Sequence, residues 1–119
     1  PVGPFSRTVR IGETLYIAGT SAITHQTGPI WDRPLAADFA TQARQTFDNV
    51  KKVMEDAGGS MSDIYKITML LKDRKYFDEI SKIRAEYFPE KAYVSTGFIT
   101  DLMRDDMLIE IDAEAYLGD

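Results

Sequence analysis

Three acidic side chains alternate along the C-terminal apolar segment, and they are the clearest candidates for chemistry. Glu110, Asp112 and Glu114 are separated by single apolar residues. Because side chains of a strand alternate between its two faces, all three are expected to point the same way. A carboxylate held in a cleft can act as a general base that orients water toward an electrophilic carbon. The pattern also fits an ordinary solvated strand face, and both interpretations stay open at this point.

Other residues with chemical potential are weaker candidates. His25 is the single histidine and lies in a predicted turn, where a solvated side chain is usual. Pro1 would carry a secondary amine able to act as base or nucleophile, or it only marks a processed or trimmed start. Trp31 lies in a loop and forms a lid, an interface plug or a filler of a hydrophobic gap. One histidine and no cysteine exclude a usual zinc site, thiolate metal sites and disulfides, so no metal or cofactor is expected.

Composition limits the possible classes of protein. A chain of 119 residues with 44% apolar content fits one globular domain spanning residues 1–119. The formal net charge of −5 argues against nucleic-acid binding, which usually needs a basic surface. No apolar run approaches the roughly 18 residues of a membrane span, and no secretory leader is recognisable. We therefore expect a cytoplasmic protein that binds neither nucleic acid nor membrane.

Residues 38–59 predict an amphipathic helix. Asp38 is a favourable N-cap, and Gly58-Gly59 offers a left-handed C-terminal cap. Between these ends, apolar residues recur every three or four positions, which is typical of one buried stripe. The stripe consists of Ala40, Ala43, Phe47, Val50, Met54 and Ala57.

A strand and a second helix follow. Residues 64–71 predict a buried strand, with Lys66 and Thr68 on one face and Tyr65, Ile67, Met69 and Leu71 on the other. Asp73 is the expected cap of the second helix, which Pro89 ends. The stripe of that helix consists of Tyr76, Ile80, Ile83 and Tyr87.

The remaining strands complete an α+β pattern. They are predicted near residues 9–11, 15–18, 93–100 and 107–116, which gives the order β-β-α-β-α-β-β. Two helices with one apolar stripe each can cover only one face of a mixed sheet. Since the strands are apolar on both faces, we expect another copy of the same chain to cover the second face.

The chain carries, in this order, GPFS at residues 3–6, AGT at residues 18–20, QARQTFDNV at residues 42–50 and IEI at residues 109–111. With these segments at matching spacing, it resembles the Rid family (reactive intermediate deaminases, also called YjgF or L-PSP proteins). Residues 3–6 (GPFS) are similar to the family's Gly-Pro-Tyr-Ser opening. Residues 18–20 (AGT) stand where it has Ser-Gly-Gln, and residues 42–50 (QARQTFDNV) are close to its first-helix signature. The last strand, with Ile109-Glu110-Ile111, also fits.

The resemblance implies a chorismate-mutase-like α+β fold and a homotrimer with small-molecule clefts between subunits. It also implies hydrolysis of a reactive enamine or imine to a keto acid and ammonia. In deaminating members, an arginine on the penultimate strand holds the substrate carboxylate, and a glutamate on the last strand positions the attacking water. Glu110 matches that glutamate, which favours the catalytic interpretation of this acid.

The resemblance also assigns substrate-binding positions. Gly19, with Thr20 beside it, matches a glycine whose backbone contacts the ligand; a plain strand-ending glycine is the alternative. Phe5 replaces the usual pocket tyrosine and keeps an aromatic face for stacking; the alternative is an aromatic side chain that only fills space in the protein interior. Ser81 stands at a ligand-facing asparagine position, or it is a solvated helix residue.

The family arginine is missing. Tyr93 or Val94 occupies its position, depending on the length of the loop before Glu110, and neither supplies a guanidinium. Losing such a charged hydrogen bond costs about 1.5–3 kcal/mol. Tyr93 could donate one neutral hydrogen bond, Ser95 would face the same cleft if the strand alternates, and Lys91 or Arg104 could swing in.

We therefore predict an enamine- or imine-directed deaminase with an atypical substrate range and without a cofactor or metal. Two alternatives stay open: a trimeric protein that binds a metabolite or regulates a partner without turnover, and a different lyase or isomerase in the same inter-subunit cleft.

Overall fold

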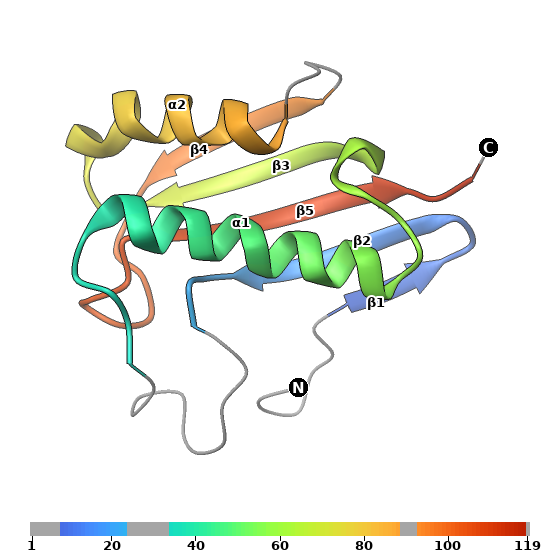
Figure 1. Cartoon of the computed structure of the whole chain (residues 1–119), viewed down its shortest axis with the longest axis horizontal. Coiled ribbons are helices and arrows are strands. Elements are labelled where there is room, and N and C mark those ends of the chain that lie inside the picture. Colours follow the sequence, from blue (N-terminus) through green and yellow to red (C-terminus); the bar gives the residue numbers. More distant parts are fainter. Residues whose placement is uncertain (1–7, 24–33, 89–92, 119) are drawn as a thin grey trace.

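The computed structural model describes residues 8–23, 34–88 and 93–118, which form one sheet with two long helices (Figure 1). The strands and helices follow the order expected from the sequence. Their bounds are β1 Thr8–Ile11, β2 Thr14–Thr20, α1 Phe39–Asp56, β3 Ile64–Leu71, α2 Phe77–Tyr87, β4 Val94–Ile99 and β5 Ile109–Tyr116. Short 3₁₀ helices at Met61–Asp63 and Arg74–Tyr76 precede β3 and α2.

The five strands form a mixed sheet in the order β1-β2-β5-β3-β4. Neighbouring strands are antiparallel except β3 and β4, which pair in parallel through the α2 crossover. β5 therefore lies in the middle of the sheet, and β4 forms one edge. This order places the acidic strand between β2, which carries Gly19, and β3.

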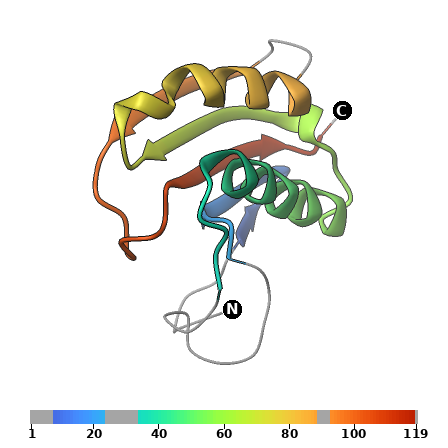
Figure 2. The ribbon, with the colours of Figure 1, turned by 60° about the vertical axis from the view of Figure 1, so that its left-hand side comes forward.

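Both helices pack on the same face of the sheet (Figure 2). The predicted stripe of α1 is in the core, where Ala43, Phe47, Val50 and Met54 are almost fully buried. α2 buries Ile80 and Ile83 against the same core. The expectation of an α+β sheet with helices on one side is confirmed.

The predicted caps act at both ends of α1. The carboxylate of Asp38 accepts hydrogen bonds from the Thr41 backbone N–H at 2.9 Å and from its hydroxyl at 2.7 Å. At the other end Gly58 has a φ of +86°, and the Gly59 N–H donates to the Met54 carbonyl. These bonds satisfy backbone groups that the helix itself leaves unpaired.

The start of β3 differs from the predicted alternation. The pairing with β5 shifts between Ile64 and Lys66, so that one extra residue is inserted. This β-bulge places Tyr65 beside Lys66 at Glu114, and the Tyr65 hydroxyl donates to the Glu114 carboxylate at 3.0 Å. The prediction that Tyr65 shares the buried face of Ile67 was therefore wrong.

Among residues 8–23, 34–88 and 93–118, no helix covers the second face of the sheet, which we call the open face. It carries the side chains of Tyr16, Glu110, Asp112 and Glu114, among others. Most of the large hydrophobic side chains that are exposed lie on strands, including Val9, Tyr16 and Val94. In the described part of the chain, no helix is long and apolar enough to cross a membrane.

Candidate functional site

Glu110 and Gly19 meet on the open face, where β2 and β5 run antiparallel. The register of this pair shifts between Ile17 and Thr20, and the resulting bulge brings Gly19 against the Glu110 side chain. A Cβ added to Gly19 would lie 2.5 Å from Glu110 Oε1, closer than real contacts allow. A side chain at this position would therefore displace the Glu110 carboxylate, which rests directly on the Gly19 backbone.

The environment of Glu110 favours its protonated form. Burial removes water from the half-buried carboxyl and raises its pKa above the ordinary value, and the nearby charge of Asp112 raises this pKa further. Within the described residues, no hydrogen bond or ion pair holds the Glu110 carboxylate. A desolvated carboxylate without a protein partner can accept a proton or bind a water molecule.

The other two acids of the strand have different surroundings. Glu114 is held by the Tyr65 hydroxyl at 3.0 Å and by Lys66 Nζ at 3.6 Å. Asp112 is more exposed than Glu110, but part of its carboxyl is shielded from water, and this partial burial raises its pKa, as does the charge of Glu114. Of the three acids that alternate in the sequence, Glu110 is the one with a half-buried carboxylate that has no partner in the part of the chain that the structure describes.

Thr20 lies on the opposite side of its strand from Glu110. Its side chain is 2% exposed, and its hydroxyl donates to the Ala18 carbonyl at 2.9 Å. Thr20 thus stabilises the bulge that carries Gly19. Gly19 itself, with Asp112 and Glu114, lines a depression of about 430 Å³ on the open face.

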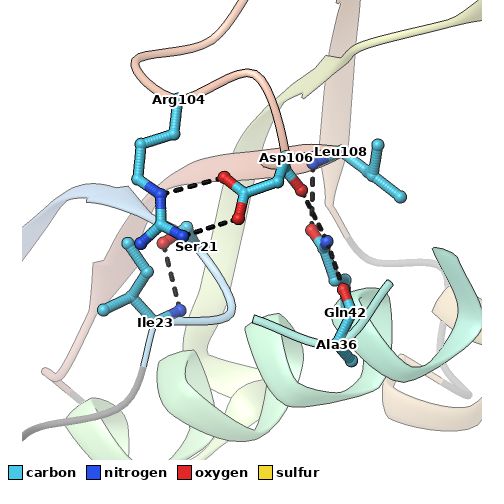
Figure 3. Close-up of polar contacts among 7 residues, drawn as sticks. All are labelled: Ser21, Ile23, Ala36, Gln42, Arg104, Asp106 and Leu108. Atoms are coloured by element: carbon cyan, nitrogen blue, oxygen red, sulfur yellow. Dashed lines mark hydrogen bonds and ion pairs between the residues drawn. The ribbon is translucent and has the colours of Figure 1, made fainter. Parts of the chain in front are cut away.

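A buried glutamine of α1 fixes the segment that leads into β5 (Figure 3). Gln42 donates from Nε2 to the carbonyls of Ala36 and Asp106, each at 2.7 Å, and its Oε1 accepts from the Leu108 N–H at 2.9 Å. Its side chain is 1% exposed. These bonds set the entry of β5 two residues before Glu110.

A second polar residue of α1 fixes the exit of β2. The Asn49 side-chain amide donates to the carbonyls of Ser21 and Ile23 at 2.9 and 3.2 Å. Gln42 and Asn49 both belong to the segment 42–50 that resembles a family signature. In this chain that segment anchors the two strands that bring Gly19 and Glu110 together.

Three further predicted residues lie in a groove between α2 and β4. Ser81, Tyr93 and Ser95 line one end of it, in a cavity of about 460 Å³. Tyr93 packs on Phe88 with ring centroids 4.6 Å apart, and the Ser81 hydroxyl donates to the Phe77 carbonyl at 3.0 Å.

The sequence analysis missed Arg84, which lies in this groove and donates from Nη1 to Ser95 Oγ at 3.0 Å. The available signal was spacing, since Arg84 follows Ser81 by three residues and shares its face of α2.

The structure brings the predicted residues together in two groups. Ser95 faces α2 on the helix-covered side of the sheet, whereas Glu110 lies on the open face. β3 also separates β4 from β5. A single chain therefore does not join Tyr93 and Glu110 in one cleft.

Several sequence candidates lie elsewhere. Phe5, His25, Trp31, Pro1 and Lys91 fall outside the described residues. Arg104, one of two cations considered as a replacement, instead pairs with Asp106 at 2.6 Å, with only 9% of its side chain exposed. Across residues 8–23, 34–88 and 93–118, no three potential ligand side chains cluster closely enough to hold a metal ion.

Comparisons with known proteins agree with this architecture. A family model described as Endoribonuclease L-PSP matches residues 1–117. A RutC family protein of Pyrococcus horikoshii is 37% identical over 98% of this chain and 89% of its own length. A protein of Dermatophagoides farinae named 2-iminobutanoate/2-iminopropanoate deaminase is 31% identical over 74% of this chain and 66% of its own length.

Solved structures give the same answer. RidA from the Antarctic bacterium Psychrobacter superposes with a TM-score of 0.84 at 27% identity, over 98% of this chain and 90% of that one. A Mycobacterium tuberculosis member of the YjgF/YER057c/UK114 family superposes with a TM-score of 0.79 at 25% identity, over 94% and 86% of the two chains. From the full-length family match and these relatives, we conclude that this chain belongs to the Rid/YjgF/L-PSP family.

Proposed function

We propose that this protein is a deaminase that hydrolyses the C–N bond of a small enamine or imine. In the proposed reaction, water adds to the imine carbon, the C–N bond breaks, and a carbonyl compound and ammonia leave. An enamine first takes a proton at carbon and releases one from nitrogen to become the imine. The reaction consumes one water and needs no redox partner, consistent with the expectation of no cofactor.

The observation that carries the proposal is the state of Glu110. Its carboxylate is half-buried, lies against the backbone of Gly19, and has no partner within the described residues. In its ionised form it can accept a hydrogen bond from water and remove a proton as the water attacks. The raised pKa makes it a better proton acceptor than an exposed glutamate, and the carboxylic acid formed in this step is the group that returns the proton to the departing nitrogen.

We further propose that two copies of the chain form each cleft within a cytoplasmic homotrimer. Glu110 lies on the open face, while Tyr93 and Ser95 lie on the helix side of an edge strand. Contact between the open face of one copy and the β4 edge of the next would bring both groups to one cleft. The contact would also cover the exposed apolar side chains of the sheet.

The deaminase name of one relative supports this reaction class. The residues at the position of the family arginine, Tyr93 or Val94, favour an unusual substrate range over efficient turnover of simple 2-imino acids. The net charge of −5 favours a metabolite over RNA as the ligand, although the matching family model carries an endoribonuclease description.

Glu110→Gln tests the function. If Glu110 positions water, the variant should lose about 10²- to 10⁴-fold in kcat, because the amide cannot accept the proton. Formation of keto acid and ammonia from freshly generated 2-imino acids, with small and with bulky side chains, measures this loss. Glu114→Gln is the matched control on the same strand and should retain near-wild-type activity.

Two results of this test would contradict the proposed function. Equal activity of the Glu110→Gln variant and the wild type would remove Glu110 from the mechanism. Wild-type protein that binds imino or keto acids without accelerating hydrolysis would instead favour the metabolite-binding alternative. A circular-dichroism spectrum and the molar mass of each variant would show that fold and assembly are retained.

A further inference from the structure

The groove between α2 and β4 gathers positive charge in a chain that is acidic overall. Arg74 and Arg84 both line it, and none of its described lining residues is Asp or Glu. The depression on the open face has the opposite character, because Asp112 and Glu114 line it. Of these two concavities, the groove therefore favours an anion.

Arg84 is placed to bind that anion. It lines both ends of the groove, and its Nη1 donates to Ser95 Oγ at 3.0 Å and contacts Met69 Sδ at 3.9 Å. Within the described residues, no carboxylate pairs with it, whereas Arg44 on the neighbouring helix is bound to Glu86 at 2.9 Å. Since a guanidinium carries five N–H donors, most of those of Arg84 remain available to a ligand.

The two ends of the groove differ in polarity. One end, in a cavity of about 440 Å³, has mainly apolar walls, to which Met69, Leu71, Phe77 and Ile99 contribute. Phe77 is 59% exposed and Ile99 is 49% exposed, so apolar surface remains uncovered there. The other end carries the hydroxyls of Ser81 and Tyr93. Small-molecule sites commonly combine an apolar wall with a few convergent polar groups in this way.

We propose that this groove binds a small carboxylate through Arg84, with an apolar or aromatic substituent of the ligand at the Phe77–Ile99 end. A guanidinium pairs with a carboxylate through two parallel hydrogen bonds, which fixes the orientation of the ligand. The identity of the reacting ligand rests on the proposed function. The expected substrates are imino or enamine acids with bulky apolar side chains. Held here, such an acid would present its C–N bond to Glu110 of a neighbouring copy.

A pair of neutral and charged probes tests the groove without relying on turnover. Phenylacetate and phenylacetamide have nearly the same shape and differ in charge, and calorimetry measures their binding to the wild-type protein. Phenylacetate should bind at least about 10-fold more tightly than the amide. Arg84→Met should weaken phenylacetate binding by about 10- to 100-fold, while Arg44→Met, the control, should leave it unchanged.

Arg84→Lys gives a second variant that keeps the charge and loses the planar fork, and its phenylacetate affinity should fall between those of wild type and Arg84→Met. With an imino acid substrate, Arg84→Met should raise KM with a smaller effect on kcat. If Arg84 only supported the fold, its substitution would not give this graded loss of phenylacetate affinity together with a selective rise in KM. The Arg44→Met control should show neither effect.

The outcomes separate the two proposals. Equal binding of phenylacetate and phenylacetamide, or phenylacetate binding that survives Arg84→Met, would overturn the groove assignment even if Glu110→Gln abolishes turnover. Arg84-dependent binding of phenylacetate without hydrolysis of any imino acid would support the groove and contradict the proposed function.

Discussion

At the scale of single residues, the strand β5 shows how neighbours separate chemically identical groups. Three acids alternate on one face, and the alternation itself does not rank them, although the family resemblance favours Glu110. The structure ranks them through their contacts: Glu114 is bound by Tyr65 and Lys66, and Asp112 is exposed. Glu110 remains desolvated against Gly19, which is the environment expected of a functional carboxylate.

Asp112→Asn should move the pH dependence of the reaction. The ionised form of Glu110 is the proposed base, so kcat/KM should rise as pH increases through its raised pKa. Burial is the main cause of that raised pKa, and the charge of Asp112 adds to it. Removing the charge should therefore lower the pKa of Glu110 and shift the rising limb of kcat/KM to lower pH. Because burial remains, the pKa should stay above that of an exposed glutamate.

The pH profile of kcat/KM measures this shift in wild type and variant. Asp78→Asn, which removes an exposed acid from α2, serves as a control and should leave the limb in place. A rising limb that stays unchanged in Asp112→Asn would show that another group sets the pH dependence.

At the scale of elements, α1 does more than cover the sheet. Its apolar stripe is buried as the sequence predicts, but the polar residues beside the stripe fix both strands of the Glu110 site. Gln42 is the central example, because one buried amide makes three hydrogen bonds, one to the segment before α1 and two to the distant segment that leads into β5. Fully satisfied buried networks of this kind make a local structure more rigid.

Gln42→Leu should therefore destabilise the fold. The substitution keeps a side chain of similar volume and leaves the Leu108 N–H and two carbonyls without their partner. Each buried unsatisfied group costs about 1–3 kcal/mol, so a loss of about 2–5 kcal/mol in the free energy of unfolding is expected. Chemical denaturation measures it. Gln45→Leu, which loses one bond to Asn49 at a half-buried position, should cost under about 1 kcal/mol.

The Gln42→Leu variant should also lose activity more than its stability at assay temperature explains, because Gln42 positions the strand that carries Glu110. Equal unfolding free energies for Gln42→Leu and Gln45→Leu would contradict the role assigned to the network.

Much of the fold could be predicted from the sequence, because caps and periodic apolar residues are local signals. The order of elements, both ends of α1 and the one-sided placement of the helices follow from Asp38, Gly58 and the two stripes. The bulge at Tyr65 could not be predicted. One inserted residue moves the tyrosine to the other face of the strand, and because tyrosine is compatible with either face, the sequence of apolar and polar residues does not reveal the insertion.

The candidate site was predicted in part. Resemblance to the family indicated Glu110 and Gly19, and the structure places them in contact. It did not indicate Arg84, because the guanidinium comes from a helix whose charged residues look solvated in the sequence. Nor can a sequence alone show that Ser95 and Glu110 lie on opposite faces of the sheet.

At the scale of the whole molecule, the described part of the chain is a two-layer slab in which one face of the sheet is uncovered. Its principal dimensions are 40 × 34 × 20 Å, and the thin direction holds one layer of helices and one sheet (Figure 2). Tyr16 is 41% exposed and Val9, paired with it, is 51% exposed. Such a surface is typical of an interface, and the proposed trimer is the assembly that would use it.

Tyr16→Lys tests this assembly on the open face. Tyr16 pairs with Glu114 across β2 and β5, so a lysine is compatible with the isolated chain and unfavourable in an apolar interface. Light scattering after gel filtration should give three times the 13.4 kDa chain mass for the wild type and a lower mass for the variant. Activity should fall in parallel, because each cleft needs residues from two copies.

Met103→Lys is the matched control, since Met103 is 70% exposed in the loop between β4 and β5 and lies off the sheet. It should leave mass and activity unchanged. A wild-type mass of one chain, with full activity retained, would refute the shared cleft, because Ser95 and Glu110 of the same chain lie on opposite faces of the sheet.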